Sequence, residues 1–384
     1  VNLDKEERVV DLNKPQLLKG FNEVTKGNGY YKARLSTAAS PKELMAGNYM
    51  LRSISKAKNT DHVIYTMESF EQYPDLHYAT LDFKKSIRLT HGIDQQKDYL
   101  WGTAELVSWI SLDGRKLEGV VYKPADFDPA KKYPMIVSFY ERNSETLFNY
   151  RMPEPHRSTI DYHLYNSNGY IVFNPDIRYV AGYPGESCYT CLMPGVAMLI
   201  GKGYIDEKAI GAQGHSWGGY QVAYLATRTD LFAAIESGAP VVNMFSAYGG
   251  IRWGSGLARS FQYEHTQSRL GGTPWSTPLR YLENSALFTM DKVQTPVLIM
   301  HNDADGHVPW YQGIEYFVAM KRLGKPCWML NYTGEPHWPT KIANKIDFQK
   351  RMFQFFNHYL KKEAMPGWMS DGVPAVEQPY ELGY

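Results

Sequence analysis

The chain has little cysteine, almost no net charge and no long apolar run, and each of these absences excludes a class of protein. Three cysteines in 384 residues cannot form the disulfide framework on which small secreted domains depend. The 41 lysines and arginines balance 40 aspartates and glutamates, so no basic nucleic-acid-binding surface is expected. No apolar run reaches the roughly 18 residues of a membrane span. We therefore expect neither nucleic acid nor a membrane span.

The cysteines that are present do not indicate a metal or redox centre. Cys188 and Cys191 form a C-x-x-C pair, but no second pair lies near enough for zinc and no thioredoxin-like pattern surrounds them. We expect both to lie at the start of a helix and to face its neighbours. Cys327 falls in an apolar strand, and we expect its side chain to pack in the core.

The first residues bear on the compartment. Residues 1–7 include neither a basic n-region nor an apolar h-region of a signal peptide. Mature secreted proteins and engineered fragments both begin in this way, so the compartment is left open. A periplasmic or secreted location is preferred over a cytoplasmic one.

The most informative stretch is residues 214–218, which read Gly-His-Ser-Trp-Gly and match the G-x-S-x-G nucleophile elbow. In such an elbow a tight turn between a strand and a helix projects the serine Oγ into the site, and the glycines leave room for neighbouring backbone. The surrounding sequence predicts a helix over 190–203, an apolar strand over 209–213 and a second helix over 221–228. This is the setting that the motif requires, and it makes Ser216 the candidate nucleophile.

A serine is a weak nucleophile unless a base activates it and an acid orients that base. An apolar strand over 295–301 leads to Asp305, and a second strand over 327–332 leads to His337. Functional groups of open α/β sheets gather where parallel strands end. The order serine, acid, histidine is also that of α/β-hydrolases. We therefore predict a triad of Ser216, Asp305 and His337.

A metal site is the alternative interpretation of the segment around Asp305. His301, Asp303, Asp305 and His307 alternate along the chain, as ligands on one face of a strand would. The segment contains Asp-Gly and Val-Pro pairs, however, which are typical of a loop. It also lacks the later ligands of a calcium-binding loop. We therefore favour the triad and expect no metal.

Six segments between about residues 104 and 360 resemble, in order, motifs of the prolyl oligopeptidase (S9) family, which includes dipeptidyl peptidase IV and acylaminoacyl peptidase. The segments are 133–140, 172–178 with 182–185, 211–220, 239–241, 284–286 and 332–337. The resemblance implies an α/β-hydrolase fold with a mostly parallel central sheet. It also implies a serine peptidase that hydrolyses peptide bonds of oligopeptides.

The resemblance assigns roles to further residues. Tyr140 matches the family's oxyanion-hole tyrosine, and the Trp217 amide would be the second donor to the oxyanion. Arg178 lies in a segment that resembles the family's arginine-containing loop and is expected to support the site. The mechanism needs no metal or organic cofactor. The expected partner is a peptide substrate, and a homo-oligomer is left open. The apolar substrate pocket is expected to contain Val241, Met244, Phe245, Tyr248 and Trp253.

The segment after Tyr140 departs from the family pattern. The family usually has small residues there, whereas this chain has Glu141, Arg142 and Asn143, which would narrow or polarise the entrance. A preference for proline is therefore not implied. An esterase or other acyl hydrolase on the same fold would share the triad but usually carries a His-Gly-Gly type oxyanion loop. A non-catalytic binding protein would be expected to lack a triad residue, and none is missing.

The first hundred residues have a different character. Short runs rich in tyrosine and β-branched residues, separated by turn clusters, predict antiparallel sheet. In the S9 family a β-propeller precedes the hydrolase domain. We therefore expect residues 1–103 to form its last blade or two and residues 104–384 to form the catalytic domain. A small self-contained β-domain is the alternative. The expected strands are 30–35, 49–55, 62–66, 77–82 and 86–90.

Overall fold

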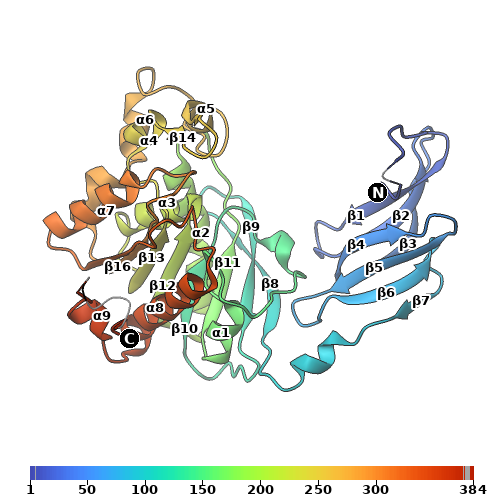
Figure 1. Cartoon of the computed structure of the whole chain (residues 1–384), viewed down its shortest axis with the longest axis horizontal. Coiled ribbons are helices and arrows are strands. Elements are labelled where there is room, and N and C mark those ends of the chain that lie inside the picture. Colours follow the sequence, from blue (N-terminus) through green and yellow to red (C-terminus); the bar gives the residue numbers. More distant parts are fainter. Residues whose placement is uncertain (5, 375, 377–380) are drawn as a thin grey trace. The chain divides into compact units, whose positions relative to one another are not determined.

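The computed structural model describes residues 1–4, 6–374, 376 and 381–384. The chain divides into two compact units (Figure 1). The first unit comprises residues 1–106 with 124–126 and 144–152, and the second contains the rest of the chain. In the described part of the chain, every helix is too short or too polar to cross a bilayer.

The first unit consists of two antiparallel sheets. One has the order β1-β2-β3 and the other the order β4-β5-β6-β7. All five strands predicted from the sequence are present, and β1 and β3 are additional. The two sheets share a core that contains Leu17, Tyr30, Leu51 and Tyr65, with the Tyr30 ring stacked on Phe83 at 5.0 Å. The elements are β1 (Pro15–Phe21), β2 (Asn28–Arg34), β3 (Lys42–Gly47), β4 (Met50–Lys56), β5 (His62–Glu68), β6 (Asp75–Thr80), β7 (Ser86–Arg88) and a 3₁₀ turn, η1 (Gly92–Gln96).

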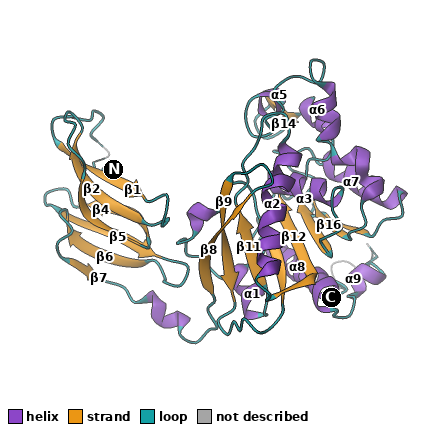
Figure 2. Ribbon diagram, turned by 180° about the vertical axis from the view of Figure 1, so that it is seen from behind, coloured by secondary structure: helices purple, strands orange, loops and turns teal. Residues whose placement is uncertain are grey.

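The second unit is built on an eight-stranded sheet with the order β17-β16-β13-β12-β10-β11-β9-β8 (Figure 2). The six strands from β17 to β11 pair in parallel, and β9 is antiparallel to β11. The predicted α/β-hydrolase fold, a mostly parallel sheet preceded by antiparallel β structure, is confirmed. The strands are β8 (Thr103–Ile110), β9 (Lys116–Lys123), β10 (Tyr133–Ser138), β11 (Ile171–Pro175), β12 (Ile205–His215), β13 (Ala234–Gly238), β16 (Val297–Met300) and β17 (Cys327–Leu330).

Helices cover both faces of this sheet. The side chains of consecutive residues in a strand point to opposite faces, and β12 shows the consequence. Ala212 joins a core shared with α2, α3 and α7, whereas a Cβ at Gly211 would lie 2.8 Å from Phe356 of α8. The main helices are α1 (Tyr162–Ser167), α2 (Pro184–Gly201), α3 (Trp217–Ala226), α7 (Tyr311–Arg322) and α8 (Ile342–Lys361). Shorter elements are η2 (Ser144–Thr146), α4 (Met244–Tyr248), β14 (Ile251–Arg252), β15 (Leu257–Ala258), α5 (Ser260–Glu264), α6 (Pro278–Glu283), η3 (Ala286–Lys292) and α9 (Gly367–Ser370).

The helix before the elbow begins earlier than predicted. The sequence suggested residues 190–203, but α2 starts at Pro184. Proline is well suited to the first turn of a helix, because its φ is already helical and its missing N–H has no intrahelical acceptor there. The longer helix contains both Cys188 and Cys191, which are free thiols, fully buried in the core with the sheet. Cys327 is also free and buried.

A carboxyl group lies in the middle of the sheet core. Glu236 of β13 is fully buried, and one of its oxygens accepts a hydrogen bond of 3.0 Å from Gln213 Nε2. The other oxygen, Oε1, has no hydrogen-bond partner in the part of the chain that the structure describes. Burial raises the pKa of Glu236 to about 8. In the folded chain the carboxyl is therefore protonated at neutral pH, whereas in the unfolded chain it is ionised.

This difference predicts a pH-dependent stability. Between the unfolded pKa and about 8 the folded state holds one proton more than the unfolded state, so stability falls as pH rises. The amide of Glu236→Gln resembles the protonated carboxyl but does not titrate, so the stability of the variant does not fall with pH for this reason. The variant should therefore gain stability relative to the original chain from roughly pH 5 to 8, by at most about 1.4 kcal/mol per pH unit. Paired urea titrations at several pH values measure this difference. A difference in the free energy of unfolding that stays the same at every pH would contradict the raised pKa.

Candidate active site

The predicted nucleophile elbow is present between β12 and α3. Ser216 has φ 61° and ψ −114°, a backbone conformation that residues other than glycine rarely adopt, and its N–H donates to the Gly238 carbonyl at 2.7 Å. The flanking glycines are needed for close backbone approach. A Cβ at Gly214 would lie 2.4 Å from the Gly218 oxygen, and one at Gly219 would lie 2.3 Å from the Gly238 oxygen. The turn therefore tolerates no side chain at these two positions.

The candidate acid and base meet at the carboxyl ends of neighbouring strands. Asp305 lies in the loop after β16 and His337 in the loop after β17. His337 Nδ1 lies 2.6 Å from Asp305 Oδ2, and both side chains are buried. A carboxylate can only accept, so Nδ1 carries the proton and Nε2 of a neutral His337 is left as the acceptor. This is the tautomer that a general base for serine requires.

Asp305 is held ionised by its surroundings. Its Oδ1 accepts from the backbone N–H groups of His307 at 2.7 Å and Val308 at 2.9 Å, while His301 Nε2 lies 3.3 Å from Oδ2. Burial opposes ionisation, but the hydrogen bonds from His301 and His337 outweigh it and hold the pKa of Asp305 well below its usual range. A fixed negative charge therefore faces His337.

Two further histidines pack against the His337 ring. The His215 ring centroid lies 4.7 Å away, and the His307 ring is stacked at 4.9 Å. Burial lowers the pKa of both His215 and His307, so both are neutral in the folded chain at neutral pH. A positive charge that forms on His337 is therefore not opposed by these neighbours. His215 also immediately precedes Ser216, so the elbow lies directly against the candidate base.

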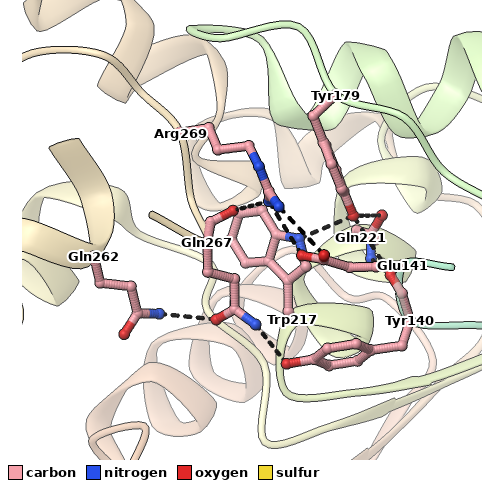
Figure 3. Close-up of polar contacts among 8 residues, drawn as sticks. All are labelled: Tyr140, Glu141, Tyr179, Trp217, Gln221, Gln262, Gln267 and Arg269. Carbon is pink, nitrogen blue, oxygen red and sulfur yellow. Dashed lines mark hydrogen bonds and ion pairs between the residues drawn. The ribbon is translucent and has the colours of Figure 1, made fainter. Parts of the chain in front are cut away.

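Tyr140, the predicted oxyanion donor, follows β10 and contacts the nucleophile. Burial raises the pKa of the Tyr140 hydroxyl, although hydrogen bonds with Gln267 and Ser216 lower it in part, so the hydroxyl keeps its proton. Gln267 Nε2 donates to the Tyr140 oxygen at 2.5 Å (Figure 3). This bond occupies a lone pair and leaves the phenolic hydrogen free to be donated. Trp217, the other predicted donor, is the first residue of α3, where N–H groups have no acceptor within the helix.

Side chains of α3 and of the loop after β11 hold this corner of the site in place. Gln221 Nε2 donates to the Tyr140 carbonyl at 2.6 Å, and the Tyr179 hydroxyl donates to Gln221 Oε1 at 2.8 Å. The Trp217 indole N–H donates to the Tyr179 oxygen at 3.0 Å (Figure 3). Sequence reasoning missed Gln221 and Gln267. Gln221 follows the elbow by one helical turn and so carries a local signal. Gln267 carries none, because 127 residues separate it from Tyr140.

Tyr140→Phe tests whether this hydroxyl acts on the oxyanion. The ring and its packing remain, and only a donor that strengthens as charge develops is removed. We expect kcat to fall by about 10² to 10³-fold with little change in KM. Steady-state kinetics on one peptide substrate measures both constants. A fall of less than about threefold would assign Tyr140 to packing alone.

The remaining predicted residues lie in different environments. Val241 and Met244 are buried in a cluster with Trp217, and Phe245 and Tyr248 pack on its edge. Trp253 is 71% exposed in the turn between β14 and β15. Whether these five residues form the substrate pocket stays a prediction. The Arg178 side chain is exposed, and its backbone N–H and carbonyl contact the Cys191 sulfur. Its supporting role also stays a prediction.

Three side chains around the candidate base are potential metal ligands and lie close together. Ligand atoms of Asp305, His307 and His337 lie within 4.8 Å of one another. Both oxygens of Asp305, however, already accept hydrogen bonds from N–H groups, and the short bond to His337 uses Nδ1. The hydrogen bonding therefore fits an acid–base pair better than a metal centre.

Comparisons with known proteins give the same family. A model of the prolyl oligopeptidase family matches residues 158–363. A dipeptidyl-peptidase 5 of Porphyromonas endodontalis is 29% identical over 280 residues, which are 66% of this chain and 37% of that protein. An uncharacterized peptidase of Bacillus subtilis is 23% identical over 316 residues, 79% of this chain and 46% of its own length. The chain thus spans less than half of these relatives.

Solved structures share the fold. An acylaminoacyl peptidase of Pyrococcus horikoshii superposes with a TM-score of 0.70 and 20% identity, over 91% of this chain and 54% of that one. Dipeptidyl peptidase 4 of Porphyromonas gingivalis gives a TM-score of 0.69 and 18% identity, over 91% of this chain and 49% of that one. The family model covers more than half of the 384 residues. The chain therefore belongs to the prolyl oligopeptidase family of serine peptidases.

Proposed function

We propose that this chain hydrolyses peptide bonds of oligopeptides through an acyl-enzyme formed on Ser216. The observation that carries the proposal is the buried 2.6 Å contact between His337 Nδ1 and Asp305, next to the strained elbow at Ser216. This contact fixes the tautomer in which His337 Nε2 can accept a proton. Family membership and relatives named as peptidases support the same reaction class.

The first half of the reaction is the attack on the substrate. His337 Nε2 takes the proton of the Ser216 hydroxyl as Oγ forms a bond to the peptide carbonyl carbon. The carbonyl oxygen becomes negative and accepts hydrogen bonds from the Trp217 amide and the Tyr140 hydroxyl. Asp305 stabilises the imidazolium, since its charge lies in the low-dielectric interior.

The second half returns the enzyme to its starting state. His337 gives its proton to the leaving amine, and the C–N bond breaks to leave an ester on Ser216. A water molecule then loses a proton to His337 and attacks the ester. The proton returns to Oγ as the carboxylic acid product leaves. Every proton in this scheme passes through one imidazole, so no metal or organic cofactor takes part.

The N-terminal unit belongs to the proposal as well. The S9 relatives that the sequence resembles carry a propeller before the hydrolase, and a propeller blade is a four-stranded antiparallel sheet. The sheet β4-β5-β6-β7 has this size and pairing. We propose that residues 1–103 contribute a blade and part of another to such a propeller.

Peptide-library profiling tests the proposed activity. The chain is incubated with a mixture of synthetic oligopeptides, and mass spectrometry identifies the products, with the Ser216→Ala variant as the matched control. We expect cleavage of peptides by the original chain only. Equal cleavage by both proteins would show a contaminating peptidase. Hydrolysis of p-nitrophenyl esters with no peptide cleaved would favour the esterase alternative.

A further inference from the structure

The second unit contains a buried arginine that has no counter-ion within the described part of the chain. Arg259 follows β15 and is 1% exposed, yet its Nε and Nη1 atoms have no hydrogen-bond partner among the described residues. Its guanidinium lies over the Tyr263 ring, 5.3 Å from the centroid. A buried charge without a partner destabilises a folded protein, because the charge has lost its hydration. A guanidinium in this state is therefore available to pair with an anion from another molecule.

Three acidic side chains of the second unit illustrate why Arg259 lacks an ion pair, because each has another polar partner. Glu264 accepts a hydrogen bond from the Tyr248 hydroxyl at 2.7 Å. Glu141 forms a bidentate ion pair with Arg269, at 3.1 Å and 3.2 Å (Figure 3). Glu315 accepts from the Ser246 hydroxyl at 3.0 Å through Oε1, while its Oε2 is buried without a hydrogen-bond partner among the described residues. Within the described residues, no carboxylate forms an ion pair with Arg259 at 4.0 Å or less.

The hairpin that carries Arg259 lies against the loop of the candidate triad. Residues 250–259 fold back on themselves, with the Arg259 N–H donating to the Gly250 carbonyl at 3.1 Å. The Gly254 N–H approaches the Gly306 oxygen at 3.4 Å, and Gly306 directly follows Asp305. The charge of Arg259 also contributes to lowering the pKa of His307, which burial lowers most. Arg259 therefore lies on the triad side of the site.

A second arginine of the same hairpin reaches the oxyanion side. Arg252 is half-buried, and its Nη2 donates to Gln262 Oε1 at 2.7 Å. Gln262 Nε2 donates to Gln267 Oε1 at 3.0 Å, and Gln267 donates to the Tyr140 hydroxyl (Figure 3). Three hydrogen bonds thus connect Arg252 to the predicted oxyanion donor. The charge of Arg252 acts on both Tyr140 and His307.

We infer that Arg252 and Arg259 form a subsite beside Ser216 that binds a carboxylate of the peptide substrate. The inference rests on the proposed peptidase function and adds a substrate class to it. A guanidinium presents a planar fork of N–H groups that matches a carboxylate, and a partly buried position strengthens the pairing. The carboxylate belongs either to an aspartate or glutamate side chain or to the C-terminus of a short peptide.

Matched substrates separate these two sources. One series carries Glu or Gln at each position from three residues before to three after the scissile bond. The other carries a free or an amidated C-terminus. We expect the original chain to prefer the charged member at one position by about tenfold or more in kcat/KM, as for a hydrogen bond to a charged group. Preference in the first series assigns a side chain, and preference in the second assigns the C-terminal carboxylate.

Variants then connect this preference to the arginines. Arg259→Met and Arg252→Met should each bring the ratio of kcat/KM for the charged substrate to kcat/KM for its neutral match to within about threefold of one. Arg228→Met is the control, because Arg228 also lies over a tyrosine ring, that of Tyr224, at 4.7 Å. It should keep the ratio. If Arg259→Met does not fold, as judged by circular dichroism, Arg252→Met carries the same comparison.

Two results would overturn the subsite. The original chain could cleave charged and neutral members equally, or both arginine variants could slow the two members by one common factor, as a structural role would. If no peptide is cleaved, the proposed function fails, and the subsite is decided by calorimetry with Ser216→Ala. Tighter binding of the charged peptide than of its neutral match then supports the subsite, and equal binding rejects it.

Discussion

Ser216→Ala should lower kcat for peptide hydrolysis by about 10⁶-fold, the largest effect expected of any single substitution in this chain. The substitution removes Oγ, so neither the covalent bond nor the proton transfer to His337 can occur. What activity remains would come from binding and from the oxyanion donors alone. Alanine keeps the Cβ and therefore adds no strain at a position that already has φ 61°. The fold should be unchanged.

Covalent labelling by a fluorophosphonate probe measures this directly. The reagent should modify the original chain once, and peptide mapping should place the adduct on Ser216. The control is Ser276→Ala, since Ser276 is an exposed serine whose hydroxyl contacts only Thr273 in the described structure. It should label normally. Undiminished labelling of Ser216→Ala would remove Ser216 from the mechanism.

The sequence predicted three strands of the central sheet, at 209–213, 295–301 and 327–332, which the structure shows as β12, β16 and β17. Of these, β16 is a short apolar run that ends in a turn, which is typical of a parallel strand between helices. The strands β8, β9, β11 and β13 were not predicted; β13 reads Ala-Ile-Glu-Ser-Gly, whose polar residues interrupt the apolar run. Two strands of the first unit were missed. The strand β1 reads Pro-Gln-Leu-Leu-Lys-Gly-Phe, in which proline and glycine have low strand propensity, and β3 reads Lys-Glu-Leu-Met-Ala-Gly, also with low intrinsic strand propensity. Both are strands because each pairs with β2, which local sequence does not reveal.

The candidate site shows the same division between local and long-range information. The elbow is a local motif, so Ser216 could be found from five residues. Asp305 and His337 could be found because each follows a strand, and the adjacency of β16 and β17 brings their side chains together. His301 was considered only as a metal ligand, whereas the structure places its Nε2 against Asp305 and the Val308 carbonyl. Arg259 could not be found from sequence, because only the fold reveals that none of the described carboxylates pairs with its buried charge.

Asp305→Asn should lower kcat by about 10⁴-fold, although it changes one atom. In the present structure both oxygens of Asp305 accept, and Oδ2 receives the His337 Nδ1 proton at 2.6 Å. Asparagine can keep its oxygen on the backbone N–H groups of His307 and Val308, which places its NH₂ group toward His337. His337 Nδ1 must then accept, its proton moves to Nε2, and Nε2 can no longer take the proton of Ser216.

Asp303→Asn is the matched control for this substitution. Asp303 lies two residues away, and one carboxylate oxygen accepts the Gly334 N–H at 2.7 Å, a bond that the asparagine oxygen can keep. We expect its kcat to stay within about tenfold of the original, since no charge next to the base is lost. Steady-state kinetics on one peptide gives both values, and fluorophosphonate labelling rates give the reactivity of Ser216 independently of substrate. If Asp305→Asn retained kcat within about tenfold, the tautomer of His337 would have to be set by another group. The nearest candidates would then be His215 and His307, whose rings pack against that of His337.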